Sequence, residues 1–581
     1  MSRLVRLAAS QIKTAVEAAY ADAVSGGVLP AAETPPFKVE VPANRDNGDF
    51  STNAAMAWAG ALRLPPRKIA EALLAGIRLE GTLFERCEAA GPGFINFTLG
   101  ERFYSGVLLE IAERGADYGR SDDGKGEKVN VEFVSANPTG PMHMGNARGG
   151  ALGDCLAAVL DFAGYRVTRE FYINDAGNQM DKFALSLDIR YRQVCGDPNA
   201  PDLPEDSYHG EDITERARQF AEIHGGAYLS KSEEERRKAL VDFALPKNIE
   251  EIRRILGIYR IGYDVWFYES TLHSNGELAE TLRLLKERGH TYESGGALWY
   301  KNKEQLTKQL LAAGKTDAEI EKLELKDEVL VRANGHPTYF AADIAYHLNK
   351  IRVRGFDRCI DVWGADHHGH VARLKGALDA AGEDGSKLDI ILMQLVRLTR
   401  NGEAVRMSKR TGKAITLGDL LEEIPVDAVR FLFNMREPAS QMEFDLGLAV
   451  ENSAKNPVYY CQYAHARICS ILKKIRADGI EPAECGHGEL RLLSTREERD
   501  LIRHLGSLTD EIAAAARTCD PARITRFLTE LATLFHKFYT ERRVACDDEA
   551  LMQARLFLCR CVRDTMKNVM ALMKITAPET M

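Results

Sequence analysis

The sequence predicts a multidomain α/β protein whose central domain is a doubly wound parallel sheet. The chain has 581 residues, more than one hydrophobic core usually organises. Strand-like and helical segments alternate through the middle of the chain, and almost every segment near its C-terminal end is helical. We therefore expect an N-terminal α+β domain over 1–122, the α/β domain over 123–446 and an all-α domain over 447–581.

The composition favours a soluble protein of the cytoplasm. Apolar residues make up 45% and charged residues 28% of the chain, which is ordinary for globular domains. No apolar run reaches the roughly 20 residues that span a bilayer. The amphipathic N-terminal segment contains acidic residues and lacks the apolar block of a signal peptide. We expect no association with membranes.

Charge and cysteine content restrict the binding partners. The net charge of −9 argues against indiscriminate coating of nucleic acid, but residues 451–581 carry 20 Lys and Arg against 18 Asp and Glu, so a local basic face is possible. The 11 cysteines are irregularly spaced and form no CxxC pair. We expect neither disulfides nor a bound zinc ion, and we assign no residue as a metal ligand.

The N-terminal segment reads as a separate module. A long amphipathic helix opens it, and Ser51 or Thr52 is placed to cap a second helix. The stretch GPGFINFTLG, near residue 95, alternates like a strand. A polar, glycine-containing segment at 119–128 then marks a domain boundary.

A βαβ unit opens the central domain. VNVEFV at 129–134 is rich in β-formers, a helix is predicted over 147–163, and 164–175 reads as a second strand. Such a unit implies a parallel sheet. Further strands are predicted at 328–333, 358–366 and 389–399. Charged helices around 185–262 interrupt the pattern and suggest an insertion packed on the outside of the sheet.

The loop between the first strand and its helix is a candidate nucleotide site. It reads SANPTGPMHMGNARGG and places His143 and Asn146 on either side of Gly145. At the carboxyl end of a parallel strand these side chains can donate to phosphate oxygens, and the glycine leaves room for a flat ligand. The alternative is a sharp turn whose histidine caps the helix.

A second candidate segment lies at 400–421. It places several cations, among them Arg406 and Lys409, around glycines in RNGEAVRMSKRTGKAITLGDLL. Cations on such a loop suit a triphosphate, whose charge must be neutralised as a phosphoanhydride bond breaks. A solvated basic turn is the alternative.

Together the two segments resemble the signatures of the class I aminoacyl-tRNA synthetases. The pattern H-x-G-[HN] matches His143–Asn146, and the second signature matches Arg406-Met407-Ser408-Lys409. The wider context resembles the arginyl-tRNA synthetases in their common bacterial form: VEFVSANPTGPMHMGNARGGALGD, REFYINDAGNQM, DVWGADHHGHVARLKGAL, NPVYYCQYAHAR and the final TAPETM. The resemblance covers nearly the whole chain and implies a Rossmann-like catalytic domain.

Two residues depart from the family pattern. The first signature usually ends in a second histidine, where this chain has Asn146, and the second usually begins with lysine, where it has Arg406. Asparagine retains a neutral donor but cannot become a cation. Arginine keeps the charge in a planar fork. Because His143 and Lys409 are retained, we expect activity to survive.

The resemblance implies that the chain activates L-arginine with ATP and transfers it to the 3′-terminal adenosine of tRNA(Arg). ATP is then a co-substrate, with Mg²⁺ carried largely by phosphate oxygens and water. The implied catalytic residues are His143, Asn146 and Lys409. The implied ATP-binding residues are His143, Gly145, Asn146, Asp366, His367, Arg406, Met407 and Lys409.

A separate set of residues is implied for arginine, whose planar cation requires carboxylates at fixed angles. Tyr339 and Asp343 lie four residues apart, on one face of a predicted helix, and would line the pocket. Glu132, Ser135 and Asn137 would bind the ammonium and carboxylate groups. Without the resemblance, Asp343 would read as an exposed helical acid.

The two outer domains are expected to bind tRNA, and two alternative functions remain open. The resemblance implies that the C-terminal bundle binds the anticodon and that the N-terminal domain binds the tRNA elbow. We expect a monomer. One alternative is a class I synthetase or nucleotidyltransferase for another amino acid. The other is a non-catalytic tRNA-binding paralogue.

Overall fold

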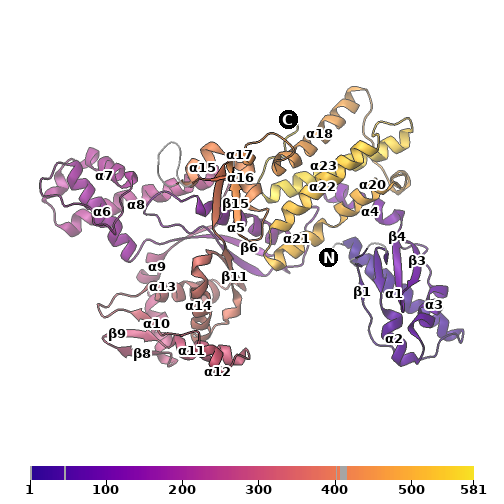
Figure 1. Cartoon of the computed structure of the whole chain (residues 1–581), viewed down its shortest axis with the longest axis horizontal. Helices are drawn as coiled ribbons and strands as arrows, with labels where there is room; N and C mark the ends of the chain where they lie inside the picture. The colour runs from indigo at the N-terminus through magenta and orange to yellow at the C-terminus, as the bar shows by residue number, and fades with distance from the viewer. Residues whose placement is uncertain (1–2, 43, 45–46, 401, 406–414) are drawn as a thin grey trace.

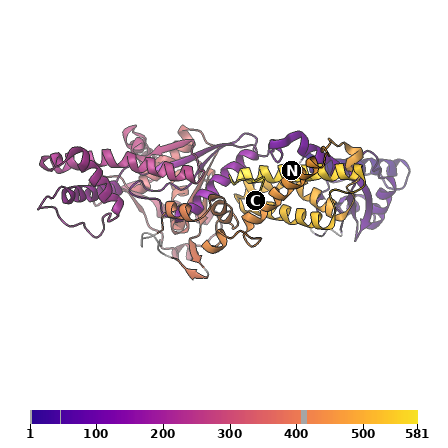
Figure 2. The same ribbon diagram turned by 90° about the horizontal axis from the view of Figure 1, so that it is seen from above.

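The computed structural model describes residues 3–42, 44, 47–400, 402–405 and 415–581. The molecule is elongated, with the N-terminal sheet at one end and two helices of an insertion, α6 and α7, at the other (Figures 1 and 2). Those helices span Asn178–Val194 and Glu211–His224. The central sheet and the C-terminal helical bundle lie between these ends.

Five parallel strands form the central sheet, in the order β12-β11-β5-β6-β7. They are β5 (Lys128–Glu132), β6 (Arg166–Ile173), β7 (Val265–Tyr268), β11 (Arg358–Gly364) and β12 (Leu388–Met393). The first strand lies in the middle, so the order reverses between β5 and β11. This is the crevice of a doubly wound sheet, where ligands bind beyond the carboxyl ends of the strands. The predicted fold class is confirmed.

Helices cover both faces of the sheet. On one face, α5 (Gly145–Phe162) packs with Ile360 of β11 in one hydrophobic cluster. On the other, α13 (Tyr339–Leu348) and α14 (His368–Ala380) pack with Cys359 in a second cluster. Neighbouring residues of β11 thus point to opposite faces, as a strand requires. The helix carrying the first signature and the helix carrying Asp343 therefore lie on opposite sides of one sheet.

One predicted strand lies outside the central sheet, and a second is divided between the central sheet and another. The segment 328–333 gives β10 (Glu328–Val331), which pairs antiparallel in the separate sheet β10-β9-β8. The segment 389–399 divides into β12 and β13 (Val396–Arg400), and β13 joins a third sheet, β14-β13-β15. Propensity identified these segments as strands, but strand pairing depends on residues far away in the chain. The short strand β7 was missed altogether.

The insertion forms its own small core. Helices α6, α7 and α8 (Glu233–Ile258) pack around Phe183, Tyr191 and Phe220. In Figure 1 α6 and α7 extend away from the sheet, and α8 leads back to it. They are therefore not laid over the outside of the sheet, as the sequence had suggested.

The remaining elements of the central region connect these layers. They are α9 (Glu269–Ser274), α10 (Glu277–Glu287), β8 (Thr291–Ser294), β9 (Ala297–Tyr300), α11 (Asn302–Ala312), α12 (Asp317–Glu321), β14 (Glu403–Ala404), α15 (Leu417–Glu423), α16 (Val426–Phe433), β15 (Met442–Asp445) and α17 (Leu446–Ala449). A π-helical turn, Asn349–Val353, continues α13.

The N-terminal region is an antiparallel sheet with helices, in the strand order β1-β2-β4-β3. Its elements are α1 (Arg3–Ser25), β1 (Val39–Glu40), β2 (Phe50–Thr52), α2 (Ala54–Leu62), α3 (Pro66–Gly76), β3 (Phe84–Ala90), β4 (Phe94–Leu99) and α4 (Glu101–Arg114). Ser51 and Thr52 lie in β2 and Asn53 is the N-cap of α2, so neither is the cap that was expected, although the Thr52 hydroxyl accepts from the Ala54 N–H at 3.3 Å.

The C-terminal region is helical, as predicted. It contains α18 (Pro457–Ala477), α19 (His487–Leu490), α20 (Arg496–Gly506), α21 (Leu508–Thr518), α22 (Ala522–Glu541) and α23 (Glu549–Leu572). Helix α4 packs on this bundle, where the Arg503 guanidinium donates to the Tyr104 hydroxyl at 2.6 Å. Among the described helices, none is both long and apolar enough to cross a bilayer.

Candidate active site

The loop between β5 and α5 is a strained turn at the carboxyl end of β5. Val134 and Ser135 adopt φ values of 71° and 40°, which are costly for residues other than glycine and are concentrated at functional sites. The Ser135 hydroxyl donates to Glu132 Oε1 at 2.9 Å and accepts from the Tyr172 N–H at 3.1 Å. These two bonds fix Ser135 between the ends of β5 and β6.

His143 lies where this loop meets the segment that begins at Ile415. The Met144 N–H donates to the Ile415 carbonyl at 3.1 Å, and the Leu417 N–H donates to the Met142 carbonyl at 2.9 Å. The His143 ring is exposed, and its Nδ1 accepts from the Gly145 N–H at 3.1 Å. In the neutral ring the proton is then on Nε2, which becomes a donor for a ligand.

Two cavities meet at His143. The smaller, of about 520 Å³, is lined by the loop, including Ser135, Asn137 and Asn146, and by Asp212 of the insertion. The larger, of about 900 Å³, is lined by His143 and by residues of two segments beyond the main sheet, 394–398 and 441–443. A ligand at His143 can therefore extend in two directions from one side chain.

Buried Arg148 fastens α5 to the wall of the larger cavity. Its guanidinium donates to the carbonyls of Gln394 (2.9 Å), Ser440 (3.0 Å) and Glu437 (2.9 Å). Burial lowers the pKa of this side chain to about 10. Arg148 belongs to the first signature region, but nothing in the sequence indicated this role, because its partners are backbone carbonyls distant in the chain.

The pocket residues expected on α13 do share one face of that helix. The Tyr339 hydroxyl accepts from the Gln179 N–H at 3.3 Å, and Asp343 Oδ2 lies 2.8 Å from His370 Nε2. His370 was not singled out from the sequence, although it ends the stretch GADHHGH. Asp366 and His367 of the same stretch lie in a 3₁₀ turn after β11, with 79% and 57% of their side chains exposed.

Glu269 is a carboxylate that the sequence reading missed. It begins α9, directly after β7, is 4% exposed and accepts from the Tyr172 hydroxyl at 2.8 Å. Burial, with further contributions from Asp343 and Asp175, raises its pKa to about 7 although the Tyr172 bond opposes this. No short-range pattern marks such a residue; its significance comes from the neighbouring acids.

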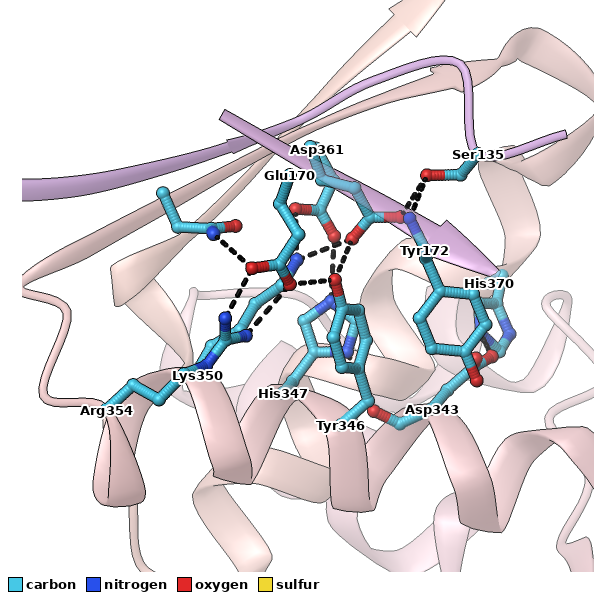
Figure 3. A network of polar contacts seen from close by, with 12 residues as sticks. Ser135, Glu170, Tyr172, Asp343, Tyr346, His347, Lys350, Arg354, Asp361 and His370 are labelled. Atoms are coloured by element: carbon cyan, nitrogen blue, oxygen red, sulfur yellow. Dashed lines mark hydrogen bonds and ion pairs between the residues drawn. The ribbon is translucent and has the colours of Figure 1, made fainter. Parts of the chain in front are cut away.

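Glu132 is bonded by the protein through both of its oxygens. Oε1 accepts from Ser135, and Oε2 accepts from the Tyr346 hydroxyl at 2.8 Å and from Lys350 Nζ at 2.6 Å. The residue is 7% exposed. Figure 3 shows the surrounding network of carboxylates and cations, which lies between α13 and the sheet. Glu132 thus contacts Ser135 from behind the wall of the smaller cavity.

Three expected site residues, Arg406, Met407 and Lys409, lie outside the described residues. The chain is described again from Ile415, and Thr416 caps α15 through a reciprocal pair of bonds with Asp419.

The comparisons with known proteins agree with this arrangement. The model of the "tRNA synthetases class I (R), catalytic domain" matches residues 110–469, that of the "Arginyl tRNA synthetase N terminal domain" matches 10–99, and that of the "DALR anticodon binding domain" matches 461–581. Together with the parallel sheet and its strand-end cavities, the first match defines a class I aminoacyl-tRNA synthetase.

Relatives narrow the class to one family. The protein named Arginine--tRNA ligase from Caldanaerobacter subterraneus subsp. tengcongensis is 51% identical, and that from Acetivibrio thermocellus is 50% identical; each match covers 100% of both chains. The chain belongs to the arginyl-tRNA synthetase family. The solved arginyl-tRNA synthetase of Thermus thermophilus shares its fold, with a TM-score of 0.69 at 23% identity, over 98% of this chain and 100% of that one.

Proposed function

We propose that the cavities at the carboxyl ends of β5 and β12 bind ATP and L-arginine for the reaction that defines the family, the ligation of arginine to tRNA. The observation that supports this best is the position of His143 on the walls of both cavities, at the carboxyl end of the central strand. Adenosine would occupy the larger cavity, and the phosphates would extend past His143 and Asn146. Asp366 and His367, exposed at the end of β11, would contact the nucleotide from the other side.

Arginine would lie over the ends of β5 and β6, with its guanidinium toward α13. Ser135 and Asn137 face the smaller cavity and would bind the carboxylate and ammonium groups, and Glu132 would act through Ser135. Asp343 and Glu269 would neutralise the guanidinium, and Tyr339 would pack beside it. Two acids whose charges disfavour one another in the empty pocket suit a permanently charged planar cation.

The chain's own residues contribute positioning and charge more than covalent chemistry. The arginine carboxylate attacks the α-phosphate, and pyrophosphate leaves. The ribose hydroxyl of the 3′-terminal adenosine of tRNA then attacks the arginyl carbonyl and AMP leaves. His143 and Asn146 would donate to phosphate oxygens during the first attack, and Lys409 with Arg406 would stabilise the departing pyrophosphate.

Magnesium enters the proposal only as the ion that accompanies ATP. Among the described residues, no group of three or more His, Cys, Asp or Glu side chains is arranged to hold a metal ion. The ion would be held by phosphate oxygens and water, and no step of the proposal passes through it.

tRNA(Arg) would bind across the outer regions. On α18 the rings of Tyr459 and Tyr463 are stacked, with centroids 6.2 Å apart and planes inclined by 6°, and the Arg467 guanidinium lies 4.7 Å from the Tyr463 centroid. Stacked rings beside a cation suit unpaired anticodon bases. The N-terminal region would contact the tRNA elbow. We retain the predictions of a monomer and of a cytoplasmic location, where tRNA charging takes place.

Neither rival function has support of its own. Nothing in the comparisons favours a non-catalytic tRNA-binding paralogue, and His143 and Lys409 are present in the sequence. A synthetase for another amino acid is opposed by the acids around the proposed guanidinium site.

The proposed arginine site predicts that the affinity for arginine depends on pH. Because the guanidinium prefers ionised Glu269, whose pKa is about 7 in the empty pocket, binding should release a proton. We expect the Kd for arginine to be up to about tenfold higher at pH 6 than at pH 8, as the ionised fraction of Glu269 falls. The measurement is calorimetric titration of arginine at pH 6, 7 and 8.

Other titratable groups lie close to Glu269, so a control variant is needed to assign the pH dependence to Glu269. They are Tyr172 of β6, Asp175 after β6, His273 of α9 and Asp343 of α13. Glu269→Gln should weaken binding and abolish most of the pH dependence, whereas titration of another group would leave the dependence in place. Equal Kd values for the parent at pH 6 and pH 8 would contradict the assignment.

A further inference from the structure

A buried ionic network fastens α13 to the central sheet. Side chains of the helix and of its π-helical continuation point toward the strands (Figure 3). Each of the six residues at the centre of the network is at most 7% exposed: Tyr346, His347 and Lys350 from the helical side, and Glu132, Glu170 and Asp361 from β5, β6 and β11. Apart from Glu132, none of them was assigned a role from the sequence.

Lys350 is the central cation of this network. Its Nζ lies 2.6 Å from Glu132 Oε2 and 2.8 Å from Asp361 Oδ1, and the residue has no exposed surface. Burial alone would lower the pKa of Lys350, but Asp361 and Glu132 outweigh it and raise the pKa, so the side chain is charged. It lies in the π-helical turn Asn349–Val353, a rare geometry that often marks functional sites.

Two neighbours extend the network on the same face of α13. The Tyr346 hydroxyl bridges Glu132 and Glu170. His347 Nδ1 lies 2.7 Å from the Asp343 carbonyl, and His347 Nε2 lies 2.7 Å from Asp361 Oδ2. Since a carbonyl and a carboxylate both accept, both ring nitrogens donate, and the ring ties the backbone of Asp343 to β11.

The network reaches both walls of the proposed arginine site. On one side Glu132 accepts from Ser135, which is itself bonded to the backbone of β6. On the other side His347 holds Asp343. We propose that Lys350 is a positioning residue for arginine: by joining Glu132 to Asp361 it sets the separation between Ser135 and Asp343. This inference rests on the proposed arginine site.

A purely stabilising role is the competing explanation. Buried ion pairs often contribute little more stability than apolar residues of the same shape, whereas removal of one partner leaves an unpaired buried charge. A stabilising role therefore predicts a lower melting temperature with unchanged ligand affinities. A positioning role predicts a loss confined to arginine, because ATP would bind on the other side of the sheet's crevice, where buried Arg148 braces the wall.

The test titrates Lys350→Met separately with arginine and with ATP by calorimetry. We expect the Kd for arginine to rise by about 10- to 100-fold, by analogy with the loss found when residues that orient metal ligands are removed, and the Kd for ATP to change by less than about twofold. A variant that binds both ligands as the parent does, or that loses both equally, would overturn the proposal.

A second variant keeps the proposal testable if Lys350→Met does not fold. Lys350→Met combined with Asp361→Asn removes one charge of each sign, and the asparagine side chain can still accept from His347. The double variant should recover most of the melting temperature while arginine binding stays weak. If arginine affinity recovers together with stability, Lys350 only stabilises the fold.

A matched control removes a buried cation elsewhere. Arg555 Nε donates to buried Glu498 at 2.8 Å within the C-terminal bundle, so Arg555→Met should lower the melting temperature without altering the Kd for arginine. If the parent protein itself does not bind arginine, the proposed function is wrong. This result differs from the one that would contradict the role of Lys350, in which the parent and Lys350→Met bind arginine equally well.

Discussion

Asp343→Asn should lower kcat/KM for arginine by roughly 30- to 1,000-fold. The substitution keeps the shape and an acceptor for His370, which lies 2.8 Å from Asp343 Oδ2, but removes the charge that would face the guanidinium. Once arginine covers this site, the lost charged hydrogen bond should cost about 2–4 kcal/mol. Binding of ATP should hardly change.

The measurement compares arginine with citrulline, which has nearly the same shape and no charge. Steady-state kinetics with tRNA present should show a smaller gap between the two amino acids in Asp343→Asn than in the parent. An equal loss for both would remove Asp343 from the specificity pocket. Asp242→Asn, which alters an exposed acid paired with Lys238 on α8, is the control and should behave like the parent.

Lys409→Ala should slow adenylate formation by roughly 100-fold or more, the effect of losing one preorganised charge donor. The prediction comes from the family signature, since the residue lies outside the described part of the structure. Arginine-dependent pyrophosphate exchange, assayed with tRNA present, measures the rate of adenylate formation. Filter binding measures the affinity for tRNA, which should stay nearly unchanged.

The control for this variant is Lys322→Ala, at the exposed end of α12. It removes an equal charge at a distance from both signatures and should retain full exchange. If Lys409→Ala charges arginine at the normal rate, the residue does not stabilise the departing pyrophosphate.

Local patterns in the sequence predicted the framework of the site. A β-rich run, a loop broken by Pro138, Gly140 and Pro141, and a helix defined β5, the loop after it and α5, because proline and glycine end regular structure where they cluster. The positive φ values of Val134 and Ser135 were not predicted, because neither residue type favours that conformation. The four-residue spacing of Tyr339 and Asp343 likewise placed them on one helical face.

Features of the fold and the site that depend on contacts with residues far away in the chain could not be predicted from local patterns. The strand β13 begins only three residues after β12 ends, yet it pairs with β14 and β15 in another sheet. Asp343, His347 and Lys350 recur at the spacing of a polar helical face, which usually faces solvent. Here His347 and Lys350 are buried because Asp361 pairs with both and Glu132 pairs with Lys350, and a helix alone carries no sign of those partners.

The most direct test of the proposed function is charging of bulk tRNA by the purified protein, with ATP and each of the common amino acids in turn. We predict that arginine is esterified to the tRNA(Arg) fraction and that no other amino acid is accepted at a comparable rate. Charging with a different amino acid would contradict the arginine pocket, and no charging with any amino acid, by a protein that still binds tRNA, would establish the non-catalytic alternative.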